Sequence, residues 1–105
     1  MELYYSTKGY VDFANVMRNL SKSATWLWWG LVEKRNNLTN ECIFKSKNGI
    51  EAKKVSKGYK ELRKANLIIR VRRQHYLINP YVYLVDSSTY MEVKNRWNRL
   101  IKEGK

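Results

Sequence analysis

The chain has 105 residues, of which 44% are hydrophobic and 13% aromatic, so it can build the core of one small domain and is not a disordered basic tail. Lysine and arginine number 21 against nine acidic residues, which gives a formal net charge of +12 at pH 7. Because like charges repel one another in a compact domain, this excess predicts an anionic partner, with nucleic acid the first candidate and a membrane surface the second.

The N-terminal residues predict a short strand and a helix. Residues Leu3–Tyr5 are apolar and aromatic, as in an edge strand, and Gly9 interrupts the segment. Asp12 can cap a helix over about Val11–Leu20. The apolar residues that recur at helical spacing in this segment are Phe13, Val16, Met17 and Leu20.

A second and longer helix follows, capped by Ser21 or Ser23 and ending near Arg35. Its apolar stripe consists of Ala24, Leu27, Trp28, Leu31 and Val32. Trp26 and Trp29 project from another side, so the helix is apolar over most of its circumference. We expect it to be largely buried, with Trp26 or Trp29 packing on the C-terminal helix or sealing a homodimer.

A short strand at Glu41–Lys45 precedes a basic helix over Ile50–Ala65. At about 100° per residue, one face of this helix is apolar and the opposite face carries four lysines. The apolar face consists of Ala52, Val55, Tyr59 and Leu62. The opposite face, called the lysine ridge from here on, consists of Lys53, Lys57, Lys60 and Lys64. Gly58, in the middle of the helix, indicates the close approach of another backbone.

A β-hairpin is predicted next, after a helix stop at Asn66. The alternating segments Leu67–Val71 and Tyr76–Asn79 flank a basic tip at Arg72–His75. Pro80 ends the second strand, because proline cannot donate to the ladder.

Beyond the hairpin, Tyr81–Val85 predicts one more short extended piece. Thr89 followed by Glu92 is the pattern of a capping box and opens a C-terminal helix over residues 88–103. The apolar stripe of this helix consists of Tyr90, Val93, Trp97, Leu100 and Ile101. This apolar stripe must be buried against another surface. The residues alone leave three roles possible for the helix: packing in the core, dimerisation, or a second contact with DNA.

Positive charge is concentrated in one segment. From Lys45 to Arg73, eleven basic residues stand against two acidic ones, Glu51 and Glu61, which accounts for +9 of the net charge. A weaker basic stretch near the C-terminus consists of Lys94, Arg96, Arg99, Lys102 and Lys105. The first segment is therefore the candidate functional surface, and the rest of the chain is predicted to be scaffold.

The order of these elements predicts a single α+β domain over residues 1–105, a winged helix-turn-helix with a short β-hairpin wing and an added C-terminal helix. The basic helix, 50–65, takes the recognition position in the major groove of double-stranded DNA, and the wing, 70–76, reaches flanking DNA. The candidate DNA-binding residues are Lys45, Lys47, Asn48, Lys53, Lys54, Ser56, Lys57, Lys60, Arg63, Lys64, Arg70, Arg72, Arg73 and Gln74.

The segment Gly58–Pro80, GYKELRKANLIIRVRRQHYLINP, resembles the recognition-helix end and wing of winged-helix replication initiators of bacterial plasmids and phages, the RepL-type proteins and their relatives. The matching residues are Tyr59, Leu62, Leu67, Ile68, Arg70, Val71, Tyr76, Ile78, Asn79 and Pro80. Differences from the family pattern are a shortened KSKNGIEAKK before the recognition helix, Asn66 in place of a common glycine, and a wing tip without glycine. The resemblance implies a DNA-binding protein of phage or plasmid type that acts in replication initiation or transcription regulation.

Other classes of function remain open from the residues. The lysine ridge could be an ordinary solvated helix face, and the tryptophan cluster could stack on bases in a single-strand or RNA binder. A small phage-type interaction protein would instead bind a host protein through its aromatic helices. The sequence has no paired-carboxylate, nucleophile or glycine-rich phosphate-loop pattern, so we expect no enzymatic activity.

Cys42 and His75 are the single cysteine and the single histidine, so we expect no disulfide framework, no metal site and no cofactor. Cys42 is predicted to be a buried small hydrophobic residue and His75 a surface turn residue. No apolar run approaches the length of a membrane span, and the first residues lack the pattern of a signal peptide. We therefore expect a cytoplasmic, nucleoid-associated protein of a bacterial host cell with no membrane partner.

Overall fold

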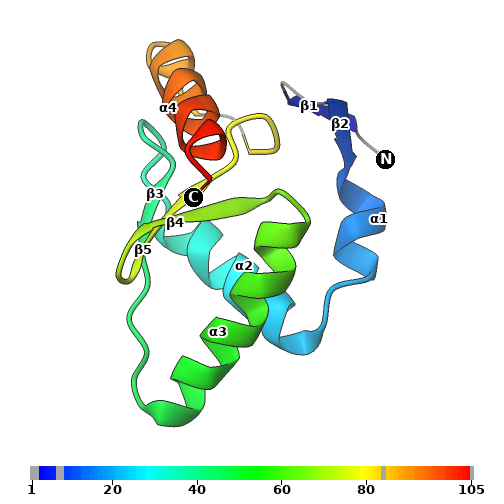
Figure 1. The fold of residues 1–105 in the computed structure, drawn as a ribbon, viewed down its shortest axis with the longest axis vertical. Coiled ribbons are helices and arrows are strands. Elements are labelled where there is room, and N and C mark those ends of the chain that lie inside the picture. Colours follow the sequence, from blue (N-terminus) through cyan, green and yellow to red (C-terminus); the bar gives the residue numbers. More distant parts are fainter. Residues whose placement is uncertain (1–2, 7–8, 84, 105) are drawn as a thin grey trace.

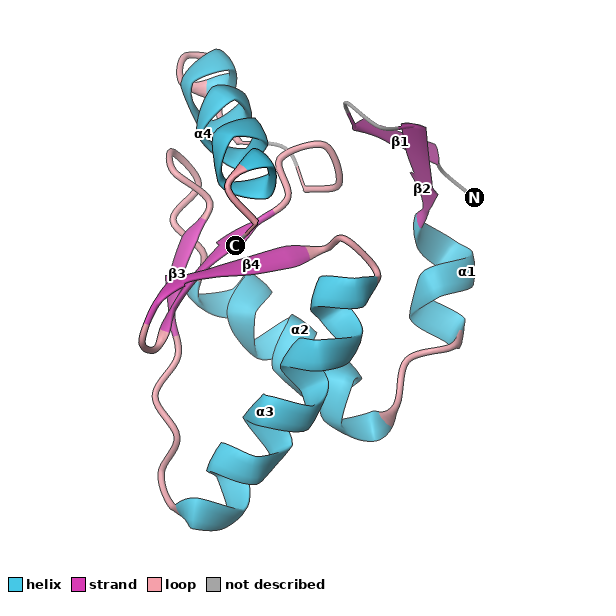
Figure 2. Ribbon diagram, viewed as in Figure 1, coloured by secondary structure: helices cyan, strands magenta, loops and turns pink. Residues whose placement is uncertain are grey.

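The computed structural model describes the backbone of residues 3–6, 9–83 and 85–104, and the side chains of residues 15–83 and 85–104. In these parts the chain forms two antiparallel sheets and four helices (Figures 1 and 2). The elements in chain order are β1 (Leu3–Ser6), β2 (Gly9–Asp12), α1 (Phe13–Arg18), α2 (Lys22–Lys34), β3 (Glu41–Ile43), α3 (Gly49–Lys64), β4 (Ile68–Arg72), β5 (His75–Ile78) and α4 (Tyr90–Lys102). The α+β class expected from the sequence is confirmed.

The N-terminal segment is a hairpin followed by a short helix. The predicted strand at Leu3–Tyr5 is present as β1, and it pairs with β2 from Leu3↔Asp12 to Ser6↔Gly9. The predicted start of the first helix at Val11 is wrong, because the backbone of Val11 and Asp12 pairs with β1 and the helix begins only at Phe13. Of the predicted stripe, Val16, Met17 and Leu20 pack against the core, while the Phe13 side chain lies outside the described part.

The three-stranded sheet has the order β3-β5-β4 and is covered by helices on both faces (Figure 2). Successive side chains of a strand point to opposite faces, and β5 follows this rule. Tyr76 and Ile78 belong to the cluster that α2 and α3 complete, whereas Leu77 belongs to the cluster that α4 completes. Ile68 and Ile69 of β4 divide between the two clusters in the same way. The sheet is therefore the middle layer between α4 and the α2–α3 pair.

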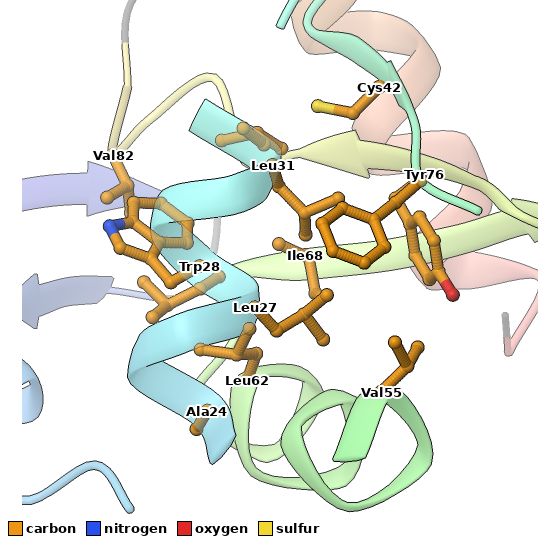
Figure 3. Close-up of a cluster of buried hydrophobic side chains, with 13 residues drawn as sticks. Ala24, Leu27, Trp28, Leu31, Cys42, Val55, Leu62, Ile68, Tyr76 and Val82 are labelled. Atoms are coloured by element: carbon orange, nitrogen blue, oxygen red, sulfur yellow. The ribbon is translucent and has the colours of Figure 1, made fainter. Parts of the chain in front are cut away.

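Helix α2 is the centre of the larger core, as its apolar stripe predicted. Its N-cap is Ser21, whose hydroxyl accepts a hydrogen bond from the backbone N–H of Ala24 at 3.2 Å. Four of its side chains are fully buried: Ala24, Leu27, Trp28 and Leu31. Figure 3 shows Trp28 on the side of α2 toward Val82 and Leu27 on the side toward Ile68. Gly58 of α3 lies against the backbone of Ser23 and Ala24, which confirms the predicted close approach.

Helix α4 covers the other face of the sheet within the same chain. Val93, Trp97 and Leu100 are buried against Ile69 and Leu77. The apolar stripe of α4, for which the sequence left several roles possible, is thus part of a second hydrophobic core.

Two local predictions before α4 are wrong. Thr89 is the N-cap of α4, but its side chain accepts no capping hydrogen bond. Its hydroxyl donates to the carbonyl of Leu38 at 2.6 Å. The predicted extended piece Tyr81–Val85 is a turn over Tyr81–Tyr83, in which Asn79 accepts hydrogen bonds from two successive amides, and Leu84 lies outside the described residues. Among the described helices, none is long and apolar enough to cross a membrane.

Candidate nucleic-acid interface

The start of α3 is held by a reciprocal pair of hydrogen bonds. Asn48, the N-cap, accepts from the backbone N–H of Glu51 at 2.9 Å, and the carboxylate of Glu51 accepts from the backbone N–H of Lys47 at 2.9 Å. This arrangement satisfies helix-end amides as a capping box does. The amide oxygen of Asn48, one of the predicted DNA-binding residues, is therefore occupied by the cap. The Glu51 carboxylate is held at the start of the helix.

The lysine ridge lies on the solvent side of α3, as predicted. Val55, Gly58 and Leu62 are buried toward α2 and the sheet. The opposite side is exposed and consists of Lys53, Lys57, Lys60 and Lys64. The predicted apolar face is only partly right, because Tyr59 is half-buried and Ala52 is exposed.

The second carboxylate of the basic segment is hydrogen-bonded to the N-cap of α2. Glu61 accepts a hydrogen bond from the backbone N–H of Ser21 at 3.0 Å, and its other oxygen accepts from the Ser21 hydroxyl. These two hydrogen bonds, the hydroxyl's first, hold the pKa of the Glu61 carboxyl below its usual value. Glu61 thus ties α3 to the start of α2 through Ser21, while its carboxylate also interacts electrostatically with Lys57 of the ridge.

The hairpin is attached to α3 by tyrosines. The Tyr59 hydroxyl accepts a hydrogen bond from the backbone N–H of Arg70 at 3.1 Å, and the Tyr59 and Tyr76 rings lie 5.9 Å apart. Gln74 turns the tip of the hairpin with a positive φ of 62°. These contacts place the basic hairpin directly beside the basic helix.

A groove of about 440 Å³ runs between the first half of α3 and the hairpin. Tyr59 and Tyr76 contribute aromatic surface to it. Its polar and basic lining consists of Ser46, Lys47, Asn48, Ser56, Arg70, Arg73 and Gln74. Six of these seven residues are predicted DNA-binding residues, so folding brings them to one surface beside the lysine ridge.

The remaining predicted residues lie around this surface or away from it. Lys45 is exposed in the segment after β3, and Arg63 lies on α3. Lys54 points toward α2, where its ammonium lies 4.5 Å from the centroid of the Trp26 ring. A bulge separates Arg70 from Arg72 in β4, and Arg72 lines a small cavity of about 60 Å³ with Arg96 of α4 instead of the groove. Lys54 and Arg72 are therefore not part of the central groove.

The tryptophans of α2 differ in their exposure. Trp28 is fully buried, and Trp26 packs edge-on against Phe44 with ring centroids 5.3 Å apart. Trp29 is the exposed member, at 51%. Neither Trp26 nor Trp29 is buried against α4, whose core partners come from the sheet and the segment that precedes the helix.

The C-terminal basic stretch lies on the other side of the sheet. Arg96 forms an ion pair with Glu41, and the Lys94 ammonium lies 5.6 Å from the centroid of the Tyr81 ring. Lys105 lies outside the described residues. These contacts attach α4 to the sheet and do not extend the α3 surface.

Cys42 and His75 lie on the paired strands β3 and β5. Cys42 is 1% exposed in β3, as predicted, and burial raises the pKa of its thiol to about 12. His75 is the first residue of β5 and half-buried, so its assignment as a turn residue is wrong by one position. Within the described parts of the chain, no group of three or more His, Cys, Asp and Glu residues could hold a metal ion.

One residue of this surface was missed at the sequence level. Ile50, the second residue of α3, is 75% exposed beside the lysine ridge. A helical wheel could have found it, since it falls next to Lys57 and well away from Val55 and Leu62. No protein-family model matches this chain, and neither a curated protein nor a solved structure matches it.

Proposed function

We propose that this chain is a double-stranded DNA-binding protein of the winged-helix type, without enzymatic activity, that acts in replication initiation or transcription regulation of a phage or plasmid. The observation that carries the proposal is the joined surface of the lysine ridge and the groove. Four lysines face solvent in register, the two carboxylates of their helix accept hydrogen bonds from residues outside it, and Arg70 and Arg73 line the adjoining groove.

The topology supports the winged-helix type. A strand precedes the basic helix, the basic helix precedes the hairpin, and the sheet order β3-β5-β4 puts the first strand beside the second strand of the hairpin. Residues 44–48, between β3 and α3, are not helical, and α2 ends at Lys34. In the described residues no helix is joined to α3 by a short turn, so the helix-turn-helix that the sequence predicts is absent there and α3 is preceded by a strand and a loop.

The mechanism follows from the sizes and charges of the two elements. The major groove of B-DNA, about 12 Å wide, admits one α-helix, and α3 presents the lysine ridge to it. Arg70 and Arg73, from the hairpin beside α3, then reach the phosphates that flank the groove. Base contacts fall to Ser56 and Gln74, which line the groove and take no part in the cap of α3.

Fluorescence anisotropy with labelled duplex DNA, single-stranded DNA and RNA, each at two salt concentrations, tests the proposal. We expect tight duplex binding that weakens steeply as salt rises, because phosphate contacts release counterions. Binding of single strands in preference to duplex, or flat curves for all three, would contradict it. Flat curves would instead indicate that the net positive charge serves to bind an acidic protein partner.

A charge-matched pair of variants locates the surface. Lys57→Gln with Lys60→Gln removes two ridge charges, and Arg99→Gln with Lys102→Gln removes two exposed charges at the same spacing on α4. The ridge variant should reduce the salt slope by about two and weaken binding at 0.1 M salt roughly 60-fold, since each phosphate contact contributes a factor of roughly eight there. Equal effects from the two variants would show that charge alone matters and that the ridge is not the binding surface.

A further inference from the structure

An isoleucine stands exposed where the helix of the proposed interface begins. Ile50 is 75% exposed, more than the other exposed large hydrophobic side chains of the described chain, which range from Leu38 at 44% to Met91 at 58%. It lies in the first turn of α3, and Figure 1 shows that this end of the helix projects away from the sheet.

Stability does not explain this isoleucine. A side chain that is three-quarters exposed gains little from burial, and a β-branched residue is a poorer helix former than alanine, lysine or glutamate. Burial in the free protein therefore does not account for this apolar group, whereas contact with a partner would bury it.

The surroundings of Ile50 identify the kind of partner. Lys53, Lys54 and Lys57 follow it at helical spacing, and Lys47 is exposed just before the helix. The ring of Trp26 has the Lys54 ammonium 4.5 Å from its centroid. A protein partner would require a contiguous apolar patch, which these lysines interrupt. The partner must instead present a small apolar group within a strongly anionic surface.

The major groove of duplex DNA presents such a group, the C5-methyl of thymine, between two rows of phosphates. We propose that Ile50 contacts a thymine methyl in the major groove and is a specificity-determining residue of this protein. This inference rests on the proposed DNA binding. The N-terminal residues of a recognition helix are those that reach base edges. In this arrangement Lys53 and Lys57, one and two turns further along α3, bind the phosphates on either side.

Removing the methyl group from the DNA and the side chain from the protein tests the contact. A duplex site is first selected from a pool with 20 random base pairs. Each thymine of that site is then replaced singly by uracil, which lacks only the methyl, and binding is measured by anisotropy. We expect one position at which uracil weakens binding of the unaltered protein three- to fivefold, the effect of one buried methyl group. Ile50→Ala should bind the thymine and uracil duplexes equally at that position.

Met91→Ala is the matched control, because Met91 is also an exposed apolar side chain at the second position of a helix, α4. It should keep the full sensitivity to uracil. The inference is overturned if no uracil substitution weakens binding, if Ile50→Ala retains the sensitivity, or if the pool enriches no sequence while duplex binding persists. Absence of duplex binding before any substitution would overturn the proposed function as well, so the two failures are distinguishable.

Discussion

The close approach of α2 and α3 at Gly58 leads to a prediction about stability. A Cβ atom added at Gly58 would lie 2.8 Å from the carbonyl oxygen of Ser23 and 3.2 Å from the Cα atom of Ala24. Both are backbone atoms of another helix, so no side-chain rotation can relieve the contact. In the variant Gly58→Ala the two helices must move apart.

Two opposing effects decide the magnitude. Alanine stabilises a helix interior by about 1 kcal/mol relative to glycine. Overpacking a well-packed core costs about 1–3 kcal/mol, and a fixed backbone contact below 3.0 Å places this site at the upper end. We expect a net loss of about 1–2 kcal/mol in the free energy of unfolding, which lowers Tm by roughly 4–8 °C in a domain of this size.

Urea denaturation followed by tryptophan fluorescence and circular dichroism measures this loss. The control is Gly49→Ala in the same helix, where an added Cβ meets nothing within 4 Å. That variant should be unchanged or more stable by up to about 1 kcal/mol. If Gly58→Ala is as stable as the unaltered protein, the helix crossing does not depend on the missing side chain and the packing argument fails.

Three further predictions concern the two cores and the tie between the helices. Trp97→Ala should cost about 3–5 kcal/mol in urea denaturation, because Trp97 is 1% exposed between α4 and the sheet, and a loss under about 1 kcal/mol would mean that α4 is not docked there. The hydrogen bonds from Ser21 lower the pKa of Glu61, so this carboxylate contributes stability above the ordinary carboxyl pKa that is lost as pH falls through its folded-state pKa. In the variant Glu61→Gln, the free energy of unfolding in urea should fall less steeply as the pH is lowered. An identical pH dependence in both proteins would contradict the stabilising role of the Glu61–Ser21 hydrogen bonds. Burial raises the pKa of the Cys42 thiol to about 12, so a disulfide reagent at about pH 8 should label it slowly in buffer and rapidly in urea, whereas fast labelling in buffer would show that β3 opens.

The elements with strong local signals were predictable from the sequence. The apolar stripe and serine cap of α2, the two faces of α3 and the alternating strands of the hairpin all appear within a residue or two of their expected places. These elements are encoded by spacing within one segment, at 3.6 residues for a helix and two for a strand, so no distant contact is needed to infer them. The lysine ridge is predictable for the same reason, because an exposed face is defined by the buried face opposite it.

Other features depended on contacts between distant segments. Sequence spacing places Thr89 and Glu92 as a capping box, but the structure gives the Thr89 hydroxyl to the carbonyl of Leu38, 51 positions earlier. The reciprocal cap is instead at Asn48 and Glu51, at the start of α3.

What the sequence by itself determined is the location of the charge along the chain and the kind of element that carries it. The tertiary structure alone decided which charges act together. In the structure Glu61 accepts hydrogen bonds from Ser21, 40 positions away, and the Lys54 ammonium lies over the Trp26 ring. Arg72 lines a cavity with Arg96, apart from the groove that Arg70 lines. The physical reason is that periodicity sets which side of an element a residue occupies, whereas only the packing of the elements sets what that side meets.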